Sequence, residues 1–323
     1  MDGQWPERLG VQVTLLPRAG IISIDNSLSI VTTQRLRAPF SSYYVFKESP
    51  LNLIEKFSLE GNTALVTGGA GLLGKQFTRT LGEAGAKVVV ADNDFDAAYA
   101  HALKLRESNI RAIAVKVDVT DLESVSALVD HTLSEYDSMD VLVNCAALDP
   151  KFDPQHIAEQ SGNSFERYPL QAWQASLDVN LTGVFLTCQA AARIMVEQGS
   201  GVIINISSIY GLAGPDQRIY PQVDGQPQFK PVDYPVTKAG ILGLTRYLAA
   251  YYAGTQIRVN ALTPGGIYHQ HDDTFTVNYS AKAILGRMAA EDEMNGALLF
   301  LASGASSYMT GANLIVDGGY TAW

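Results

Sequence analysis

The glycine-rich segment at residues 67–74 limits the possible folds of this chain more than any other feature. It reads T-G-G-A-G-L-L-G, directly follows a short apolar run at residues 63–67 and opens a helical pattern that continues to about residue 85. Gly68 permits a tight turn, Gly71 allows close backbone approach to a pyrophosphate, and Gly74 allows close packing of helix on strand. A strand, glycines, a helix and a second strand in this order predict a dinucleotide-binding βαβ unit.

Strand and helix patterns then alternate along the chain. Residues 87–91 form a nearly continuous β-branched run, as expected for a strand buried on both faces. The further predicted strands are residues 112–117, 141–144, 202–206, 257–261 and 314–316, and the helices are residues 97–107, 122–135, 170–198 and 232–253. This order predicts a single doubly wound α/β (Rossmann) domain with a seven-stranded parallel sheet and helices on both faces.

Residues 1–50 do not follow this alternation. They contain one tryptophan and four prolines, at Trp5, Pro6, Pro17, Pro39 and Pro50, and show no sustained helix or strand period. They also lack the basic start and following apolar run of a secretory signal. We interpret residues 1–50 as an irregular N-terminal extension and residues 51–323 as the NAD-binding domain. An alternative hypothesis is that the extension is not native and that translation starts at the codon read as Leu51.

The charge of the chain narrows the function classes. Lys+Arg 23 against Asp+Glu 33 gives a net charge of −10, so no basic field is present to attract nucleic acid or an anionic membrane. The most apolar stretch, residues 181–196, contains Thr182, Gln189 and Arg193 and is too short to span a bilayer. Cys145 and Cys188 lie far from any metal-ligand spacing and are predicted to be buried thiols in a reducing cytoplasm; no metal site is expected.

Asp92 follows the second strand, at the distance from the glycine loop where a ribose-binding acid is expected. A carboxylate there binds the adenosine ribose and repels a 2′-phosphate, and no Arg or Lys stands in residues 67–70 or directly after Asp92. NAD is therefore predicted in preference to NADP. The alternative role of Asp92, a helix N-cap, is compatible with this one.

A tyrosine and a lysine four residues apart, Tyr234 and Lys238, share one face of a predicted helix. Bringing a tyrosine pKa from about 10 to neutrality requires roughly 4 kcal/mol. A lysine ammonium about 4 Å away supplies on the order of 4 kcal/mol at an effective dielectric of 20. The electrostatic free energy supplied by the lysine alone is thus large enough to make the tyrosine a proton-transfer group.

Tyr234 and Lys238 form the Y-x-x-x-K motif, and the chain resembles the short-chain dehydrogenase/reductase family over residues 52–323. N-I-S-S at residues 205–208, V-N-L-T-G at residues 179–183, N-C-A-A at residues 144–147 and N-A-L-T-P-G-G at residues 260–266 carry the resemblance further. It implies Tyr234 as general acid/base, Lys238 as its activator, Ser208 as a ligand of the substrate oxygen and Asn180 as the holder of a relay water. The implied cofactor-binding residues are Gly68, Gly71, Leu72, Leu73, Gly74, Asp92, Asp118, Val119, Asn144, Ala146, Tyr234, Lys238, Pro264, Gly265 and Ile267.

The sequence departs from the family pattern at three places. Leu72 stands where a glycine is usual, a spacing similar to that of the extended branch with its sugar-nucleotide epimerases and dehydratases. Cys145 and Ala147 alter the N-N-A-G motif. His269 replaces a threonine that binds the nicotinamide carboxamide, and we expect no catalytic role for it.

Two long polar loops, residues 149–169 and 215–231, are predicted to flank the substrate at the carboxyl ends of the strands. The segment 215–231 offers Asp216, Gln217, Arg218, Tyr220 and Lys230, a set that suits a hydroxyl-rich substrate with a phosphate. The segment 149–169 adds Lys151, His156, Glu166 and Arg167. Arg218 and Lys230 are the candidate phosphate ligands. The alternative is that these are solvated loop residues.

The segments at residues 207–220, 234–249 and 317–323 resemble flagellin-modification oxidoreductases of sialic-acid-like sugar pathways. The resemblance implies a cytoplasmic NAD(H)-dependent enzyme, a homo-oligomer (dimer or tetramer), that interconverts a secondary alcohol and a ketone on a sugar phosphate or nucleotide sugar of bacterial surface-glycan biosynthesis. The alternatives are an NAD-retaining sugar-nucleotide epimerase or dehydratase and a non-catalytic NAD-binding regulator. The epimerase or dehydratase is disfavoured because too few residues follow Lys238 to form the separate substrate domain of that branch. The regulator is disfavoured because it would have no need of the Ser208, Tyr234 and Lys238 proton relay.

Overall fold

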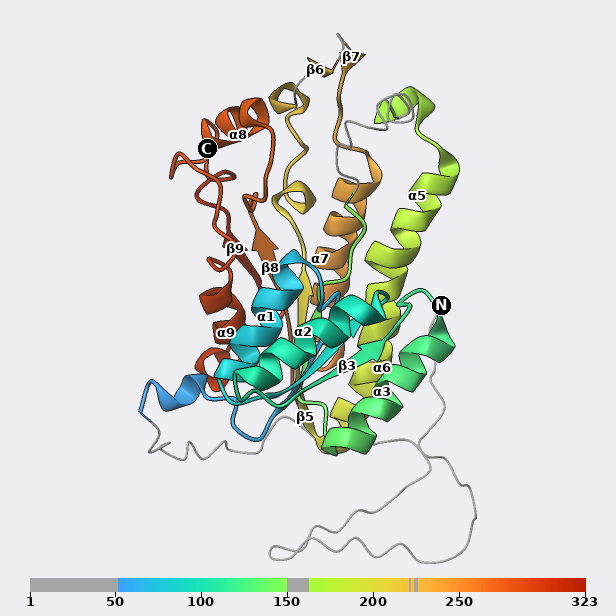
Figure 1. The fold of residues 1–323 in the computed structure, drawn as a ribbon, viewed down its shortest axis with the longest axis vertical. Coiled ribbons are helices and arrows are strands. Elements are labelled where there is room, and N and C mark those ends of the chain that lie inside the picture. The colour runs from blue at the N-terminus through green and yellow to red at the C-terminus, as the bar shows by residue number, and fades with distance from the viewer. Residues whose placement is uncertain (1–51, 150–162, 221, 224–225) are drawn as a thin grey trace, which may run out of the picture. The chain divides into compact units, whose positions relative to one another are not determined.

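The computed structural model describes residues 52–149, 163–220, 222–223 and 226–323. The N-terminal extension, residues 1–50, and most of the first long loop therefore lie outside the described residues, as do Lys151 and His156. The described residues form a doubly wound α/β domain with a parallel sheet between two helical layers (Figure 1). The predicted fold class is confirmed.

Seven strands make the main sheet in the order β3-β2-β1-β4-β5-β8-β9, and every pair is parallel. The strands are β1 (Thr63–Thr67), β2 (Lys87–Asp92), β3 (Ala112–Lys116), β4 (Val141–Asn144), β5 (Ser200–Ile206), β8 (Gln256–Pro264) and β9 (Asn313–Val316). Chain order reverses between β1 and β4, and the carboxyl ends beside such a reversal are where α/β proteins bind ligands.

Apolar side chains pack on each face of the sheet. On one face lie α1 (Leu72–Glu83), α2 (Phe95–Glu107) and α9 (Asn295–Ala302), which contribute Phe77, Ala98 and Leu298 to the core. On the other lie α3 (Leu122–Tyr136), α6 (Gly183–Gln198) and α7 (Asp233–Tyr251), which contribute Leu128, Met195 and Ile241.

The long helix predicted over residues 170–198 is present but divided. α5 (Leu170–Leu177) and α6 are joined by a single π-helical stretch, η5 (Asp178–Thr182). Such wide turns occur often at functional sites. By length and composition alone, Leu170–Gln198 is long and apolar enough to cross a membrane, and 44% of its most apolar stretch is buried inside the protein. Its α6 part packs against the sheet as a core helix, which explains the apolar composition.

Two regions of the chain hold elements that the sequence did not predict. The prediction contained no helix between residues 262 and 313, where α8 (Asp273–Ser280) and α9 lie, and it treated the second long loop as irregular. That loop holds a 3₁₀ turn, η7 (Gln217–Ile219), and a small hairpin of β6 (Gln222–Val223) and β7 (Gln226–Pro227). The hairpin and α8 lie beyond the end of the sheet to which the β8 arrow points (Figure 1).

Candidate active site

The glycine loop forms a narrow turn between β1 and α1. Gly68 has φ +64°, a conformation that side chains other than glycine rarely adopt. A Cβ on Gly68 would lie 2.7 Å from the backbone of Ala146, and one on Gly74 would lie 2.0 Å from the Gly68 carbonyl oxygen. Backbone therefore packs on backbone at both positions, and the start of α1 stays open to a ligand. This geometry fits a pyrophosphate at a helix N-terminus.

Asp92 ties the glycine loop to the end of β2. Its carboxylate accepts hydrogen bonds from the Ala70 N–H (2.9 Å) and the Asp94 N–H (3.1 Å). Asp94, which accepts from the Ala97 N–H (3.0 Å), is the N-cap of α2. The N-cap interpretation of Asp92 was therefore wrong, while Asp92 itself lines the cavity as expected of a ribose ligand.

A cavity of about 930 Å³ runs from this loop along the carboxyl ends of the strands. That volume lies at the upper end of the range for small-molecule sites and leaves room for a dinucleotide and a small substrate. Of the predicted cofactor residues, those that line it are Gly68, Gly71, Leu72, Leu73, Gly74, Asp92, Asp118, Val119, Ala146, Tyr234, Lys238, Pro264, Gly265 and Ile267.

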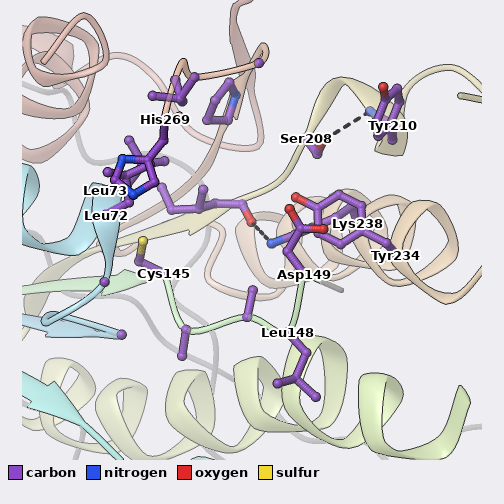
Figure 2. Close-up of a pocket in the computed structure, with 18 of the residues that line it drawn as sticks. Leu72, Leu73, Cys145, Leu148, Asp149, Ser208, Tyr210, Tyr234, Lys238 and His269 are labelled. Carbon is purple, nitrogen blue, oxygen red and sulfur yellow. Dashed lines mark hydrogen bonds between the residues drawn. The ribbon is translucent and has the colours of Figure 1, made fainter. Parts of the chain in front are cut away.

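Tyr234, Lys238 and Ser208 meet in this cavity (Figure 2). Tyr234 and Lys238 lie one turn apart near the start of α7, and Ser208 follows β5. The Lys238 Nζ lies 5.6 Å from the centre of the Tyr234 ring and donates a hydrogen bond to the Ile206 carbonyl oxygen at 3.0 Å. The Asp233 carboxylate accepts from the Tyr234 N–H at 2.8 Å and holds the start of the helix.

Burial controls the protonation of this pair in the protein alone. It raises the pKa of Tyr234 well above its ordinary value, with the Asp149 carboxylate adding to the rise and a hydrogen bond with Ser208 opposing it. Burial also lowers the pKa of Lys238 to about 8. Burial thus opposes the effect expected from Lys238, because removal from water disfavours the phenolate. Activation of Tyr234 by Lys238 stays a prediction.

Asn180 is buried on the π-helical stretch and does not line the described cavity. Its side chain accepts from the Leu148 N–H (2.7 Å) and donates to the Leu148 carbonyl oxygen (2.9 Å). A longer contact of 3.3 Å joins it to the Thr237 hydroxyl on α7. The side chain thus connects the segment after β4 to the catalytic helix, and these bonds engage both of its polar atoms.

Asn144 is likewise buried and lies outside the described cavity lining. It donates to the Asn205 side-chain oxygen (2.9 Å) and accepts from the Thr187 hydroxyl (2.7 Å). Its side chain is engaged in this network, and Asn144 as a cofactor-binding residue stays a prediction. A polar network of this kind, fully hydrogen-bonded in the core, holds β4, β5 and α6 in register.

The two candidate phosphate ligands lie in different environments. Lys230 lines the cavity, and its Nζ lies 4.0 Å from the centre of the Tyr234 ring. The Arg218 side chain is 87% exposed, pairs with Asp216 at 2.8 Å and does not line the described cavity. Asp216 and Gln217 do not line it either, whereas Tyr220 does. Glu166 and Arg167 of the first long loop are exposed and lie outside the lining as well.

Several lining residues come from the segment after β8, where the sequence predicted no helix and no catalytic role for His269. His269 lines the cavity and pairs through Nδ1 with Glu291 at 3.0 Å. His271 stacks on Phe275 of α8 with 5.3 Å between ring centres. Tyr279 accepts a short hydrogen bond from the Gly266 N–H and packs against Tyr320. The D-D pair at residues 272–273, where Asp272 caps α8, was the available signal for this helix.

The thiols are poor candidates for chemistry. Cys145 lines the cavity, and burial raises its pKa to about 12; burial does the same to Cys188, also to about 12. Neutral thiols of this kind are weak nucleophiles. Within the described ranges, no cluster of three or more His, Cys, Asp or Glu side chains could hold a metal ion.

Known dehydrogenases and reductases match this chain over about four fifths of its length and over nearly all of their own. A family model described as enoyl-(acyl carrier protein) reductase matches residues 69–321. A cis-4-hydroxycyclohexanecarboxylate dehydrogenase of Sinomonas cyclohexanicum is 39% identical over 80% of this chain and 96% of its own. A D-threitol dehydrogenase of Mycolicibacterium smegmatis is 33% identical over 82% and 95%.

A solved structure agrees with these relatives. The gluconate 5-dehydrogenase of Burkholderia cenocepacia, crystallised with NADP and tartrate, is 30% identical and superposes with a TM-score of 0.72. The match covers 84% of this chain and 100% of that one. The similarity therefore extends over the whole described domain, including the cavity.

Proposed function

The chain belongs to the short-chain dehydrogenase/reductase family and is an oxidoreductase acting on CH–OH groups, and from this premise we propose that it interconverts a secondary alcohol and a ketone with NAD(H). One observation carries the proposal. Tyr234, Lys238 and Ser208 line the same cavity as the glycine loop and Asp92, so a proton-transfer group and a dinucleotide cradle face one space.

The residues divide the work as follows. When bound, the nicotinamide accepts or supplies the hydride. Tyr234, in its acid form, gives its proton to the carbonyl oxygen during reduction and takes it back during oxidation. Ser208 donates a hydrogen bond to the same oxygen. Lys238 stabilises the phenolate that forms, and Asn180 keeps the segment after β4 in place against α7.

The direct experiment is to follow NADH formation by absorbance with purified protein, NAD⁺ and a panel of secondary alcohols, and its loss with the matching ketones. Net turnover of cofactor supports the proposal. A product formed without net change in NAD would favour the epimerase or dehydratase alternative. Cofactor binding without any reaction would favour the regulator.

The pH dependence should differ in sign between the two directions. Alcohol oxidation needs Tyr234 deprotonated, so kcat/KM for oxidation should rise from neutral to alkaline pH because burial raises the pKa of this tyrosine. Ketone reduction needs the protonated form and should stay flat and then fall over the same range. Parallel profiles in the two directions would show that another group transfers the proton.

Asp92 supports NAD as the cofactor in preference to NADP. Its carboxylate is fixed by two backbone N–H groups and faces the cavity. The described lining contains no arginine, and its lysines are Lys230 and Lys238 at the other end. A basic residue, Lys116, lies opposite Asp92 in the strand pairing of β2 with β3.

Asp92→Ala should therefore weaken NAD binding by about tenfold, the loss expected for a charged hydrogen bond, and relax the discrimination against NADP. In this variant the 2′-phosphate of NADP is no longer repelled by the Asp92 carboxylate, and the Lys116 ammonium remains on the neighbouring strand to attract it. Dissociation constants for both cofactors, measured by thermal shift or fluorescence, test this. Asp96→Ala, in the first turn of α2 and outside the main cavity, is the matched control. If the NAD/NADP ratio does not change in Asp92→Ala, selectivity comes from elsewhere.

The narrower hypothesis concerns the substrate and its pathway. The resemblance of residues 207–220, 234–249 and 317–323 to flagellin-modification enzymes supports a sugar phosphate or nucleotide sugar. The relatives named for a cyclohexane carboxylate and for threitol support a small hydroxylated substrate more generally. Arg218 no longer supports a phosphate, since its guanidinium binds Asp216 in solvent. Lys230 remains the candidate ligand of an anion.

We further propose a cytoplasmic homo-oligomer, a dimer or a tetramer. Exposed apolar side chains on two neighbouring helices support self-association: Phe185 and Val196 on α6, and Val236, Tyr247 and Tyr251 on α7. Light scattering of the purified protein measures the number of subunits. A monomer at micromolar concentration would contradict this proposal.

A further inference from the structure

A second lysine, Lys230, stands beside Tyr234 at the substrate end of the cavity. Its Nζ lies over the ring face at 4.0 Å from the centre, closer than the Nζ of Lys238 at 5.6 Å. Only 10% of the Lys230 side chain is exposed. A lysine at this depth is retained at a considerable cost in desolvation, so its charge needs a partner.

The second long loop is built to hold Lys230 in this place. The Gln217 side-chain amide accepts from the Lys230 N–H (2.8 Å) and donates to the Lys230 carbonyl oxygen (3.3 Å). The η7 turn that carries Gln217 is itself anchored, because Ile219 is buried in a cluster with Ile209, Tyr279 and Met288. Asp216 also forms an ion pair with Lys282.

The present partner of Lys230 is Asp149, with which it forms a short ion pair. Asp149 comes from the segment after β4, and its side chain is 44% exposed. Breaking this ion pair costs a different free energy for Asp149 than for Lys230, because their exposure to water differs. The Asp149 carboxylate can return to water, whereas the buried ammonium of Lys230 cannot be left without an anion. A ligand anion can therefore replace Asp149 without exposing Lys230.

The distance between Lys230 and the reacting oxygen limits where that anion sits. The reacting alcohol must be within a hydrogen bond, about 2.8 Å, of the Tyr234 hydroxyl, and the anion within a similar distance of the Lys230 Nζ. Because the Nζ lies over the same ring, the two substrate groups are only a few bonds apart. A diphosphate joined to a nucleoside would not meet this limit as well as a compact acid.

We propose that Lys230 is the substrate's anion-binding residue, and that the substrate carries a carboxylate or phosphate a few bonds from the alcohol carbon, which replaces Asp149 on Lys230. This proposal rests on the oxidoreductase function above and assigns the substrate class of that site. Lys238 is assigned to the phenolate of Tyr234, and the described lining residues include no arginine, so the single ammonium of Lys230 favours the single charge of a carboxylate.

The test uses hydroxy acids of increasing separation between alcohol and acid, from 3-hydroxybutyrate to cis-4-hydroxycyclohexanecarboxylate, each beside its methyl ester. Glycerol 3-phosphate is the phosphate arm. The acids should exceed their esters in kcat/KM by at least about tenfold, the factor expected for one charged hydrogen bond. A higher kcat/KM for glycerol 3-phosphate than for any carboxylate would assign a phosphate as the anion.

Two variants should act in opposite directions. Lys230→Met keeps the apolar stem and should remove the preference for acid over ester, mostly through KM. Asp149→Asn removes the competing carboxylate and should lower KM for the acids severalfold relative to KM for the matching esters of the same variant. Arg218→Ala, whose side chain is in solvent, is the control and should change neither. A purely structural ion pair would make both variants lose activity alike, on acids and esters, and would overturn the proposal.

A binding measurement separates this proposal from the proposed chemistry. In Tyr234→Phe with NAD⁺ present, the acids should still raise the melting temperature, and Lys230→Met added to it should abolish the rise. Binding without turnover in the wild type would leave the anion site standing while removing the oxidoreductase proposal. A third outcome would overturn the anion site alone: the enzyme turns over neutral alcohols, does not prefer acids over esters, and binds neither the acids nor glycerol 3-phosphate.

Discussion

Tyr234→Phe should lower kcat by at least about a hundredfold in both directions, within the range by which a positioned proton-transfer group accelerates a reaction. In the proposed mechanism this hydroxyl is the proton donor, and burial raises its pKa. Phenylalanine keeps the packing of the ring against Lys230 and removes only the hydroxyl. NAD binding should therefore change little, since the glycine loop and Asp92 remain intact.

Stopped-flow measurement of NADH formation gives the chemical step, and thermal shift with NAD⁺ gives cofactor binding. Tyr247→Phe on the same helix, with the side chain 62% exposed, is the matched control and should keep wild-type kcat. A Tyr234→Phe enzyme with more than about a tenth of wild-type kcat would exclude Tyr234 as the proton donor, because general acid–base catalysis supplies a larger factor.

Gly74→Ala should abolish cofactor binding and destabilise the domain. The added Cβ would lie 2.0 Å from the Gly68 carbonyl oxygen and 2.8 Å from the Gly69 Cα, and neither backbone atom can move without opening the turn. Overpacking in a rigid core lowers the free energy of unfolding by about 1–3 kcal/mol. Because the added Cβ meets backbone atoms, Gly74→Ala should lower it by about 3 kcal/mol or more. The start of α1 would shift away from the pyrophosphate position.

Chemical denaturation and NAD titration measure the two effects of Gly74→Ala. Gly296→Ala in α9 has nothing within 4 Å of the added Cβ and should be neutral or stabilising by up to about 1 kcal/mol. Gly71→Ala, with one contact at 3.2 Å, should lie between the two. If Gly74→Ala bound NAD with wild-type affinity, the close packing of α1 on the turn would not be needed for the cofactor.

Most of the fold was predictable because its signals are local. The strands β1, β2 and β4 are short apolar runs bounded by turn residues, and their predicted limits agree with the structure to within one residue. The split of the long helix at Asp178–Thr182 was not predictable, because a π-helical turn shares the periodicity of its neighbours too closely. α8 was missed although Asp272 marks its start.

The candidate site was predicted in part. The glycine loop, and Tyr234 with Lys238, depend on residues a few positions apart, so their spacing alone placed them in one unit. Whether the side chains of Asn144 and Asn180 reach the cavity depends on partners far along the chain, at Asn205 and Leu148, and these partners turn both side chains away. The family pattern identified the positions but not the hydrogen bonds made there.

Sequence by itself determined the fold class, the dinucleotide cradle and the tyrosine–lysine pair, because near neighbours in the chain encode strand, turn and helix. Tertiary structure alone decided the burial of Tyr234 and the choice between Lys230 and Arg218. Both cations stand in the same polar loop, but the Gln217 amide holds Lys230 against Tyr234 while Asp216 binds Arg218 in solvent. Burial and charge pairing arise from segments brought together by folding, and no pattern of neighbouring residues contains them.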